Sequence, residues 1–557
     1  MTTSSKEDFL HFRAPRQDGN YLCVPSASAL DHQISRNVEL LSHVPLSIAG
    51  TDLPTLRRVT RSALLGLAGA KDACDSLLFV SGHQPELFHP GVWLKNFVLD
   101  QLARQHHGVA LNIVIDQDLC RSTSIRSPAW NSSEGLHTVQ IPWDSSPSGA
   151  AWEMHTIADR KLWDAFPDRI EQALRPWKLK PLAHPLWQTA TQFLDRGKTV
   201  GSALAAARHQ IEKQHGLKTL ELTSGHLTQT IGFWKLIQHL AINAQQFHTV
   251  YESCLADYRQ AHRIRSVSHP VPNLQRVNSY FEMPLWVYSQ SHPRRRPVFA
   301  CWQNNELEFT DLRQWSYRIS IRQSEENWIE ELIQLQNKHG IHLRPRALLT
   351  TMFLRLFVGD WFIHGIGGGK YDQLNDRIIR SFFGIEPPKY SVITGTVFLP
   401  FANALAANPA KNESRLHQPD PSSIAPPTLS QHHSDARWRW LEAKQLPRRI
   451  RYHLPPPVSS HSHEWQKAWD RKQTLLNNIP PRGEKKQWHQ EISEIQRQLQ
   501  RFRDTEVEKS LSQISTAQRD LLDSRIFESR EYSFSLFPEE WLCQRLRDLS
   551  MRCLATT

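Results

Sequence analysis

The stretch Ser81-Gly-His-Gln-Pro-Glu-Leu-Phe-His-Pro-Gly91 joins a predicted buried strand to a predicted helix. The short apolar run 77–80 precedes it, and apolar residues recur at helical spacing over 92–104. An open α/β sheet binds its ligand just beyond the carboxyl ends of its strands. Two histidines, a glutamine and a glutamate at such a junction therefore indicate a ligand-binding turn.

A second apolar run, 109–115, follows this helix and is suited to burial on both faces, as in parallel sheets. It ends in Asp116-Gln117-Asp118, again at the carboxyl end of a strand. The resulting β-α-β unit spans about 40 residues, a normal size for a right-handed crossover. These features predict an α/β fold around a parallel sheet.

The chain has 557 residues, too many for one ordinary core, so we expect several structural units. In chain order they are a helical lead-in over 1–75 with helices at 27–43 and 54–68, the first half of the sheet core over 76–150, an inserted, mainly helical connecting region with short strands over 151–325, the second half of the core over 326–400, a Pro- and Asn-rich linker over 401–435 and a charged helical hairpin over 436–557.

The C-terminal part carries a heptad seam, because its apolar residues step by four and three. Pro480-Pro-Arg-Gly483 separates the seam from an earlier helix with Trp465 and Trp469, which predicts an antiparallel helical hairpin. A homodimer through this coiled coil is one expectation. The seam residues are Trp488, Ile492, Ile495, Leu499 and Phe502, followed by Val507, Leu511 and Ile514.

The composition narrows the class of protein. The net charge of +11 comes from 66 basic and 55 acidic residues, a mixture that favours a solvated surface over a nucleic-acid partner. Basic and aromatic residues alternate over 437–440, but beside a charged helix they are more often a solvated face. None of the seven cysteines forms a CxxC or CxxH pair, and the sequence shows neither a signal-peptide core nor a membrane-spanning run. We therefore expect a soluble, cytoplasmic protein that does not bind membranes.

The turn after the first strand offers His83, Gln84, Glu86 and His89. Histidine and carboxylate side chains at this spacing can bind a metal, but Pro85 and Pro90 rule out a regular helix that presents them on one face. A turn that contacts an anionic ligand is favoured, because free N–H groups and the helix dipole attract anions at a helix N-terminus. An ordinary structural turn is the remaining alternative.

Two further groups are candidates for chemistry. Asp116 and Asp118 could hold magnesium, bind an amine or act as a base, or one of them could simply cap the next turn. His364-Gly-Ile-Gly-Gly-Gly-Lys-Tyr-Asp372 places three consecutive glycines before a helix, where their amides can cradle a phosphate or carboxylate. It is not a Walker A loop, because Tyr371 stands where a serine or threonine would bind magnesium. A loop without a ligand is the alternative.

Together these motifs resemble those of the cysteine-adding enzymes of bacillithiol biosynthesis, a family of ligases, over most of the chain. That family carries T-G-Q-Q-x-G-L-F/L-x-G-P after a strand, similar to the segment 81–91, although His83 and Glu86 replace a glutamine and a glycine. Its next strand ends in E-D-H-D, similar to Ile115-Asp-Gln-Asp118. A later G-G-P-G-E-x-x-Y-x-x-Q-L segment is similar to Gly367-Gly-Gly-Lys-Tyr-Asp-Gln-Leu374.

The resemblance implies a Rossmann-like core with inserted connecting segments, similar to class I aminoacyl-tRNA synthetases, and a C-terminal coiled coil. It also implies that an amino acid, cysteine in that family, is joined by an amide bond to a carboxylated, sugar-linked acceptor. An amine that attacks a thioester, an acyl phosphate or a free acid needs a base and an oxyanion stabiliser.

We therefore expect an amino-acid ligase or transferase with a small-molecule substrate and no assigned metal; whether a nucleotide is a cofactor stays open. One alternative is a non-catalytic relative whose basic coiled coil binds a protein or nucleic acid. Another is a metal-dependent hydrolase that uses His83, Glu86 and His89. The expected catalytic residues are His83, His364 and Asp116, and the expected substrate- or anion-binding residues are Gln84, His89, Asn96, Asp118, Gly367, Gly368, Gly369 and Lys370.

Overall fold

Contacts within the chain divide it into two units. Unit 1 comprises Met1–Ser127, Val139–Leu399 and Arg530–Thr557, and unit 2 comprises Pro128–Thr138 and Pro400–Ser529. The expected linker lies outside the described residues from position 402 onwards. The computed structural model describes residues 9–145, 149–266, 268–269, 271–303, 306–320, 325–401, 440, 463–481, 483, 485–501 and 504–555.

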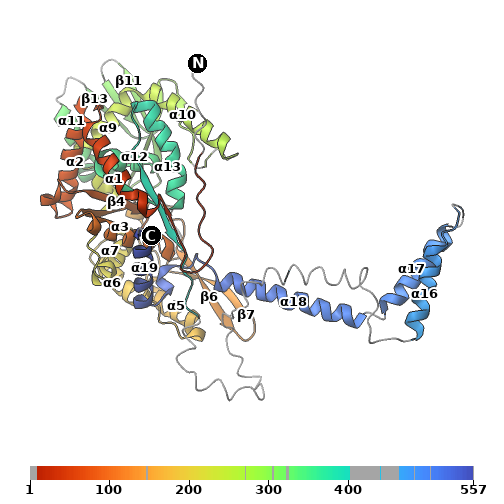
Figure 1. The fold of residues 1–557 in the computed structure, drawn as a ribbon. Helices are drawn as coiled ribbons and strands as arrows, with labels where there is room; N and C mark the ends of the chain where they lie inside the picture. The colour runs from red at the N-terminus through yellow and green to blue at the C-terminus, as the bar shows by residue number, and fades with distance from the viewer. Residues whose placement is uncertain are drawn as a thin grey trace. The chain divides into compact units, whose positions relative to one another are not determined.

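Unit 1 is built on a six-stranded sheet in the order β1-β16-β15-β4-β5-β8. Figure 1 labels β4, a central strand of this sheet, and the helices α2, α3 and α13. Five strands run parallel and β1 pairs antiparallel with β16, so the predicted α/β fold with a mostly parallel sheet is confirmed. Counted along the chain, the parallel strands lie in the order 3-2-1-4-5, and the winding reverses between β4 and β15. The strands are β1 (Tyr21–Val24), β4 (Leu78–His83), β5 (Val109–Val114), β8 (Leu220–Thr223), β15 (Trp361–His364) and β16 (Tyr390–Gly395).

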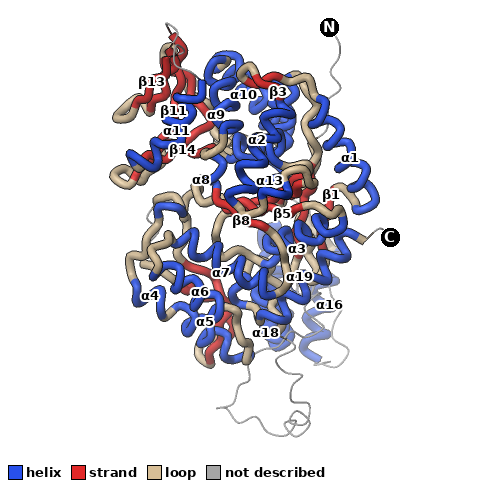
Figure 2. The backbone as a smooth tube through the Cα atoms, turned by 90° about the vertical axis from the view of Figure 1, so that its left-hand side faces the viewer, coloured by secondary structure: helices blue, strands red, loops and turns tan. Residues whose placement is uncertain are grey.

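Helices cover both faces of this sheet, in keeping with the mainly apolar character of its central strands. Leu78, Phe79 and Val80 of β4 are fully buried, as are Leu111 and Ile113 of β5. In Figure 2 helices α3 and α19 lie below the strands, and α2 and α13 lie above them. The covering helices are α2 (Leu53–Leu67), α3 (Pro90–Gln105), α12 (Ala347–Phe353), α13 (Ile366–Ile378) and α19 (Glu539–Leu554), with π-helical turns η4 (Leu354–Val358) and η5 (Ile379–Phe383) after α12 and α13.

The lead-in contains the two expected helices, α1 (Ala27–His43) and α2. Asp52 caps α2 by accepting a hydrogen bond from the Thr55 amide at 2.8 Å. Strand β1, at the sheet edge, was not predicted, because its four residues carry no periodic pattern long enough to identify. The short strands β2 (Ser47–Ile48) and β3 (Thr51–Asp52) pair with each other between the two helices.

The connecting region is helical as expected, but its short strands form a complete second sheet in the antiparallel order β13-β12-β11-β10-β14, with β9 paired to β10. Strand β14 belongs to this sheet, although its residues fall in the range expected for the second half of the core. The helices are α4 (Arg160–Asp164), α5 (Phe166–Leu174), α6 (Ala183–Asp195), α7 (Val200–Gln214), α8 (Ser224–Leu227), α9 (Ile231–Ile242), α10 (Ala244–Ala261) and α11 (Glu325–His339). The strands are β9 (Arg276–Val277), β10 (Tyr280–Ser289), β11 (Arg296–Gln303), β12 (Glu306–Thr310), β13 (Ser316–Ser320) and β14 (Ile341–Pro345).

Unit 2 contains the predicted helical hairpin, formed by α16 (His463–Asn477) and α17 (Lys485–Arg501). The indole N–H of Trp488 donates to the Leu475 carbonyl at 2.8 Å, which fixes the antiparallel register. A small core fills the hairpin, and Phe502 of the expected seam lies outside the described residues. Helix α18 (Asp504–Phe527) follows, and the hairpin of β6 (Ser124–Asn131) and β7 (Gly135–Pro142) has its central residues in this unit. The core residues are Trp465, Ala468, Ile495 and Leu499.

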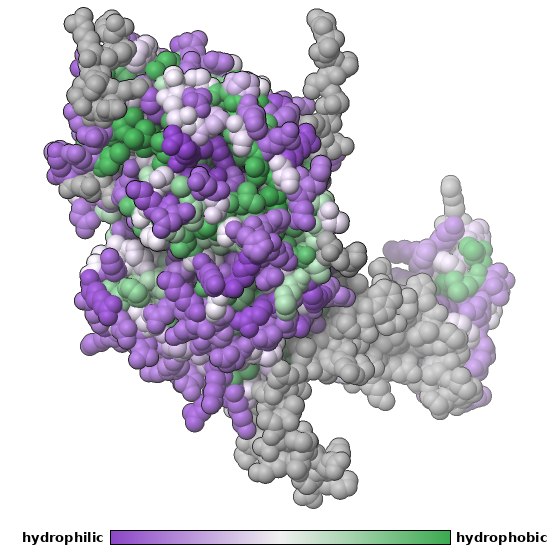
Figure 3. All heavy atoms as spheres, turned by 60° about the vertical axis from the view of Figure 1, so that its left-hand side comes forward, coloured by the Kyte–Doolittle hydropathy of each residue, from purple (hydrophilic) through white to green (hydrophobic). Residues whose placement is uncertain are grey.

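The last part of the chain differs from the expected organisation. Residues from Arg530 onwards belong to unit 1, where α19 packs on α3, instead of extending the charged helical hairpin. In the ranges that the structure describes, no helix has the combined length and apolar character needed to cross a bilayer. Hydrophilic side chains dominate the described surface drawn in Figure 3, and hydrophobic ones gather only in small areas.

Candidate functional site

The candidate site lies at the carboxyl ends of β4, β5 and β15, which are neighbouring strands. The turn 84–89 follows β4, Asp116 and Asp118 follow β5, and Gly365 follows β15. Since the winding of the sheet reverses between β4 and β15, the helices that leave these two strands depart to opposite faces and leave a crevice between their N-termini. We call this region the switch-point crevice.

Gln84 and Asp118, both predicted to bind substrate, lie in direct contact. The Gln84 amide donates to the Asp118 carboxylate at 2.9 Å, and the Leu119 amide donates to the other oxygen at 2.8 Å. Arg295 completes the group, because its guanidinium lies 3.1 Å from Asp118 and 3.0 Å from the Gln117 carbonyl. The turn before β11 thus reaches the carboxyl end of β5.

Glu86 and Tyr371 lie close to the same carboxylate. Burial raises the pKa of Glu86, and the nearby Asp118 charge raises it further. Burial also raises the pKa of Tyr371, with contributions from Asp372 and Asp118. Tyr371 comes from α13, so residues that follow β4, β5 and β15 all converge on Asp118.

Asp116, which was expected to work with Asp118, has separate partners. Its carboxylate accepts hydrogen bonds from the amide and the hydroxyl of Ser224, at the first residue of α8. Burial and the neighbouring Glu153 raise the pKa of Asp116. Glu153 is in turn held by Arg344 at 2.9 Å. Asp116 therefore caps the start of α8, a helix distant along the chain, instead of the next turn, and the two aspartates do not form one pair.

His83 and Asn96 lie on the wall of a small hollow beneath the turn, which has room for about one water molecule. Burial, and then the charge of Lys95, lower the pKa of His83 to about 3, so this ring is neutral at physiological pH. Asn112 lines the same hollow, and its side-chain oxygen has no hydrogen-bond partner among the described residues. His83 is therefore suited to hydrogen bonding and is poorly suited to accept a proton.

His89 has a structural role at the start of α3. Its ring nitrogen Nδ1 accepts a hydrogen bond from the Gly91 amide at 3.1 Å, and Pro90 opens the helix. In the described part of the chain, His83, Glu86 and His89 are not among the groups whose ligand atoms converge closely enough to share a metal ion. The structure therefore does not bring these three side chains together as one set of ligands, and the metal-hydrolase alternative stays a prediction.

Another set of residues does converge, at His209, Glu212 and Glu221. Arg208 already pairs with both carboxylates, at 2.6 Å to Glu212, and Trp93 and Asn96 donate to the same Glu212 oxygen at 2.7 Å each. The cluster is thus an ion-pair network in which one arginine is shared by two carboxylates. Asn96, expected to contact substrate, is one of its donors.

Lys95 is a site residue that the sequence did not identify. It is 2% exposed, and its ammonium donates to the Gly82 carbonyl at 2.9 Å. Burial, together with the Arg208 charge, lowers the pKa of Lys95 to about 7. Its charge in turn lowers the pKa values of His83 and His364, which places Lys95 between the ends of β4 and β15.

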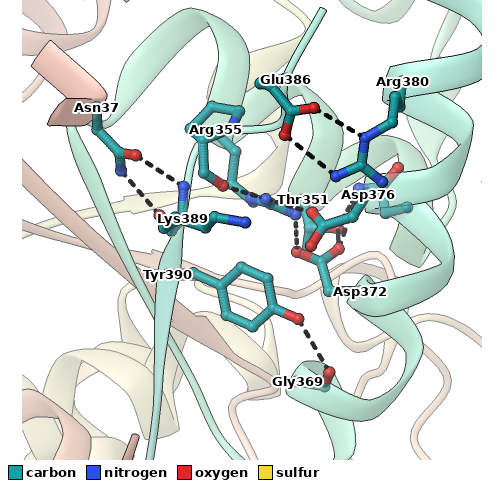
Figure 4. A network of polar contacts seen from close by, with 12 residues as sticks. Asn37, Thr351, Arg355, Gly369, Asp372, Asp376, Arg380, Glu386, Lys389 and Tyr390 are labelled. Atoms are coloured by element: carbon teal, nitrogen blue, oxygen red, sulfur yellow. Dashed lines mark hydrogen bonds and ion pairs between the residues drawn. The ribbon is translucent and has the colours of Figure 1, made fainter. Parts of the chain in front are cut away.

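His364 lies at the end of β15 and faces the interior. Its Nε2 lies 2.9 Å from Asp372, and burial lowers its pKa despite that carboxylate. Asp372 also pairs with Arg355 at 2.5 Å, and Arg355 pairs with Asp376 at 2.5 Å (Figure 4). The Tyr390 hydroxyl closes the network by donating to the Gly369 carbonyl at 3.2 Å. A histidine with these partners anchors α13 to the sheet.

The glycines were expected to form a loop before the helix, and this prediction was wrong. Gly367, Gly368 and Gly369 form the first turn of α13, where the Gly369 amide donates to the Gly365 carbonyl at 2.9 Å. A Cβ on Gly368 would lie 2.5 Å from the His364 ring, and one on Gly369 would lie 2.3 Å from Val392. Close packing therefore requires these glycines. The first amides of the helix still have no side-chain cap.

Lys370 is exposed on α13, and its carbonyl accepts a hydrogen bond from Tyr258 at 3.0 Å. Its charge contributes to the lowered pKa of His262, on the side of α10. The structure therefore places Lys370 next to α10, and no contact joins it to Asp118 or Lys95.

Two of the important residues escaped sequence analysis for different reasons. Arg295 lies 177 positions from Asp118 along the chain, and only the basic turn 294–296 marked it. Lys95 lies on a helix whose apolar residues surround it, since α3 is buried on nearly all sides. The signal that could have identified it is a lone lysine in an otherwise apolar helical stretch. Compared with known proteins, the chain matches neither a protein-family model nor a curated protein.

Proposed function

We propose that this protein is an enzyme that joins an amine, such as an amino acid, to a carboxylated acceptor in the switch-point crevice. The observation that carries the proposal is the contact of Gln84 and Arg295 with Asp118 at the carboxyl end of the sheet, where the Asp118 charge also acts on Glu86. We further propose that the core is Rossmann-like, which the strand order 3-2-1-4-5 supports.

The arrangement supplies the groups that amide formation needs. An amino acid enters as an ammonium ion, and its nitrogen must lose a proton before it attacks a carbonyl carbon. Glu86, with its raised pKa, is suited to take that proton, while Asp118 attracts the ammonium. Arg295 and the Gln84 amide are donors that can hold the acceptor or stabilise a developing oxyanion. These roles replace those expected for His83, His364 and Asp116, whose side chains are committed elsewhere.

The resemblance of the 81–91 turn to the cysteine-adding enzymes supports this choice of reaction and makes cysteine the first amine to test. The acceptor class follows from the same resemblance, so hydroxy acids such as malate and their sugar conjugates are the first acceptors. The acceptor carboxyl needs activation as a thioester or an acyl phosphate, and a nucleotide could supply the latter.

The test is a ligand screen by thermal stability, followed by mass spectrometry of mixtures that contain an amino acid, a hydroxy acid and a nucleotide. Amino acids should raise the melting temperature of the wild type, and the variants Asp118→Asn and Glu86→Gln should lose this response. Asp195→Asn is a matched control, because Asp195 pairs with Arg160 at 2.8 Å on the exposed surface. A wild type that responds to no amine and forms no conjugate would refute the proposal.

A further inference from the structure

Buried cations in unit 1 normally have a carboxylate partner. Arg57 pairs with Asp360 at 2.7 Å, and Arg208, Arg344 and Arg355 also pair with carboxylates. Lys95 departs from this pattern. Among the described residues, no carboxylate lies within ion-pair distance of its ammonium, and its one hydrogen-bond partner is a neutral carbonyl.

An uncompensated ammonium is costly to bury, because desolvation strongly disfavours the charged form. Two of its three N–H groups remain available after the bond to Gly82. The side chain runs toward α13, since its Cδ lies 4.0 Å from the position of a Cβ on Gly365, the N-cap of that helix. Lys95 therefore brings a second positive group to a helix N-terminus that already carries partial positive charge.

The first turn of α13 is accessible from solvent at Gly367. Gly367 is exposed, and a Cβ at its position would meet no atom within 4 Å. Gly365 has no side chain that could cap the turn, so the amides of Ile366 and Gly367 are unsatisfied within the helix. Backbone amides at a helix start, together with a nearby ammonium, are the donors that oxyanions require.

We propose that Lys95 and the first-turn amides of α13 form a binding site for an oxyanion, the carboxylate or phosphate group of a substrate. One oxygen accepts from the Lys95 ammonium and a second accepts from the amides of Ile366 and Gly367. The site deepens the proposed function and rests on it for the identity of the substrate, because the amine would lie at Asp118 on the β5 side and the oxyanion on the β15 side. The reacting groups would then be aligned along the sheet edge.

The experiment is a calorimetric titration of the full chain at neutral pH with inorganic phosphate and, separately, with malonate, at constant ionic strength set with sodium chloride. The wild type should bind at least one of the two, and the preferred anion identifies the source of the oxyanion. Lys95→Met should weaken that binding about tenfold or more, as expected for the loss of a charged hydrogen bond. Lys235→Met is the matched control, since Lys235 is also buried and donates to the Ala49 carbonyl at 3.3 Å. This variant should bind the anion as tightly as the wild type.

A second variant tests the amides without touching the lysine. Ile366→Pro removes one N–H at the first position of α13, where proline is tolerated, and the extended backbone of Gly365 suits a following proline. It should weaken anion binding, whereas Gly367→Ala keeps its N–H and should not. Equal binding by wild type and Lys95→Met, or no binding of either anion by the wild type, would overturn the inference. If anion binding depended on Lys95 but no amine raised the melting temperature, the proposed function would be refuted and the anion site would stand.

Discussion

Two buried cations flank α13 in different ways. Arg355, drawn in Figure 4, is enclosed by Asp372, Asp376 and the Pro388 carbonyl, and its guanidinium lies 4.6 Å from the centre of the Tyr390 ring. Lys95 has one carbonyl and no carboxylate. The charge of Arg355 is compensated inside the protein by two carboxylates, so that network can stabilise the fold without a ligand. The charge on Lys95 is available to a ligand from solution. The Arg355 network is therefore a structural site, whereas Lys95 belongs to the proposed binding site.

The largest expected effect comes from opening the closed network. Asp372→Ala should lower the free energy of unfolding by about 3–5 kcal/mol, because it leaves Arg355 and His364 buried without their shared carboxylate. Urea denaturation measures the change. Asp376→Asn is the comparison, since Asp376 is partly exposed and its loss should cost clearly less. Equal losses would show that the network is not organised around Asp372.

Asp372 stabilises the fold, whereas the charge on Lys95 should destabilise it, and the size of this destabilisation should depend on pH. Its pKa is about 7 in the folded protein and near 10.5 in the unfolded chain, so between these values only the unfolded chain binds the proton. The free energy of unfolding should therefore rise with pH from about 7 to 10, by an amount of the order of a few kcal/mol. Below pH 7 both states bind the proton and this contribution does not change.

The comparison for this effect is Lys95→Met, which removes the ionisable group. The variant should be more stable than the wild type near pH 6, and the difference should shrink toward pH 10. Denaturant titrations at several pH values measure it, because all other groups cancel between the two proteins. If the difference in the free energy of unfolding stayed constant across this range, the Lys95 ammonium would have a compensating partner in the folded protein.

A smaller effect is expected at the start of α3. His89→Ala should cost about 1 kcal/mol through loss of the N-cap, and His89→Asn should recover most of it, because asparagine is a good cap. Thermal denaturation of both variants checks whether His89 acts as the N-cap of α3. If neither variant changed stability while both lost ligand binding, His89 would belong to the binding site after all.

The smallest effect on stability is expected at Glu86. Glu86→Gln should change the free energy of unfolding by no more than about 0.5 kcal/mol, since no ion pair or hydrogen bond holds this side chain in the described structure. The same variant should lose the response to amines. A large loss of stability instead would assign Glu86 a structural role.

Local patterns predicted strands β4 and β5 and the position of the crevice, because apolar runs and turn residues reflect nearby packing. The Gln84–Asp118 contact followed from two strand ends that meet at one sheet edge. The glycine stretch was misassigned, because low helix propensity predicts a loop, while packing against His364 and Val392 requires glycine inside the helix. Arg295 and Lys95 depend on tertiary packing, which local periodicity does not contain.

The most direct test of the account is the pKa of Lys95, measured by NMR of protein with 13C-labelled lysine side chains and assigned with Lys95→Met. The account predicts one lysine that titrates near pH 7 in the free protein and at a higher pH once phosphate or malonate is added. A Lys95 resonance that titrates near pH 10.5 and ignores both anions would contradict it.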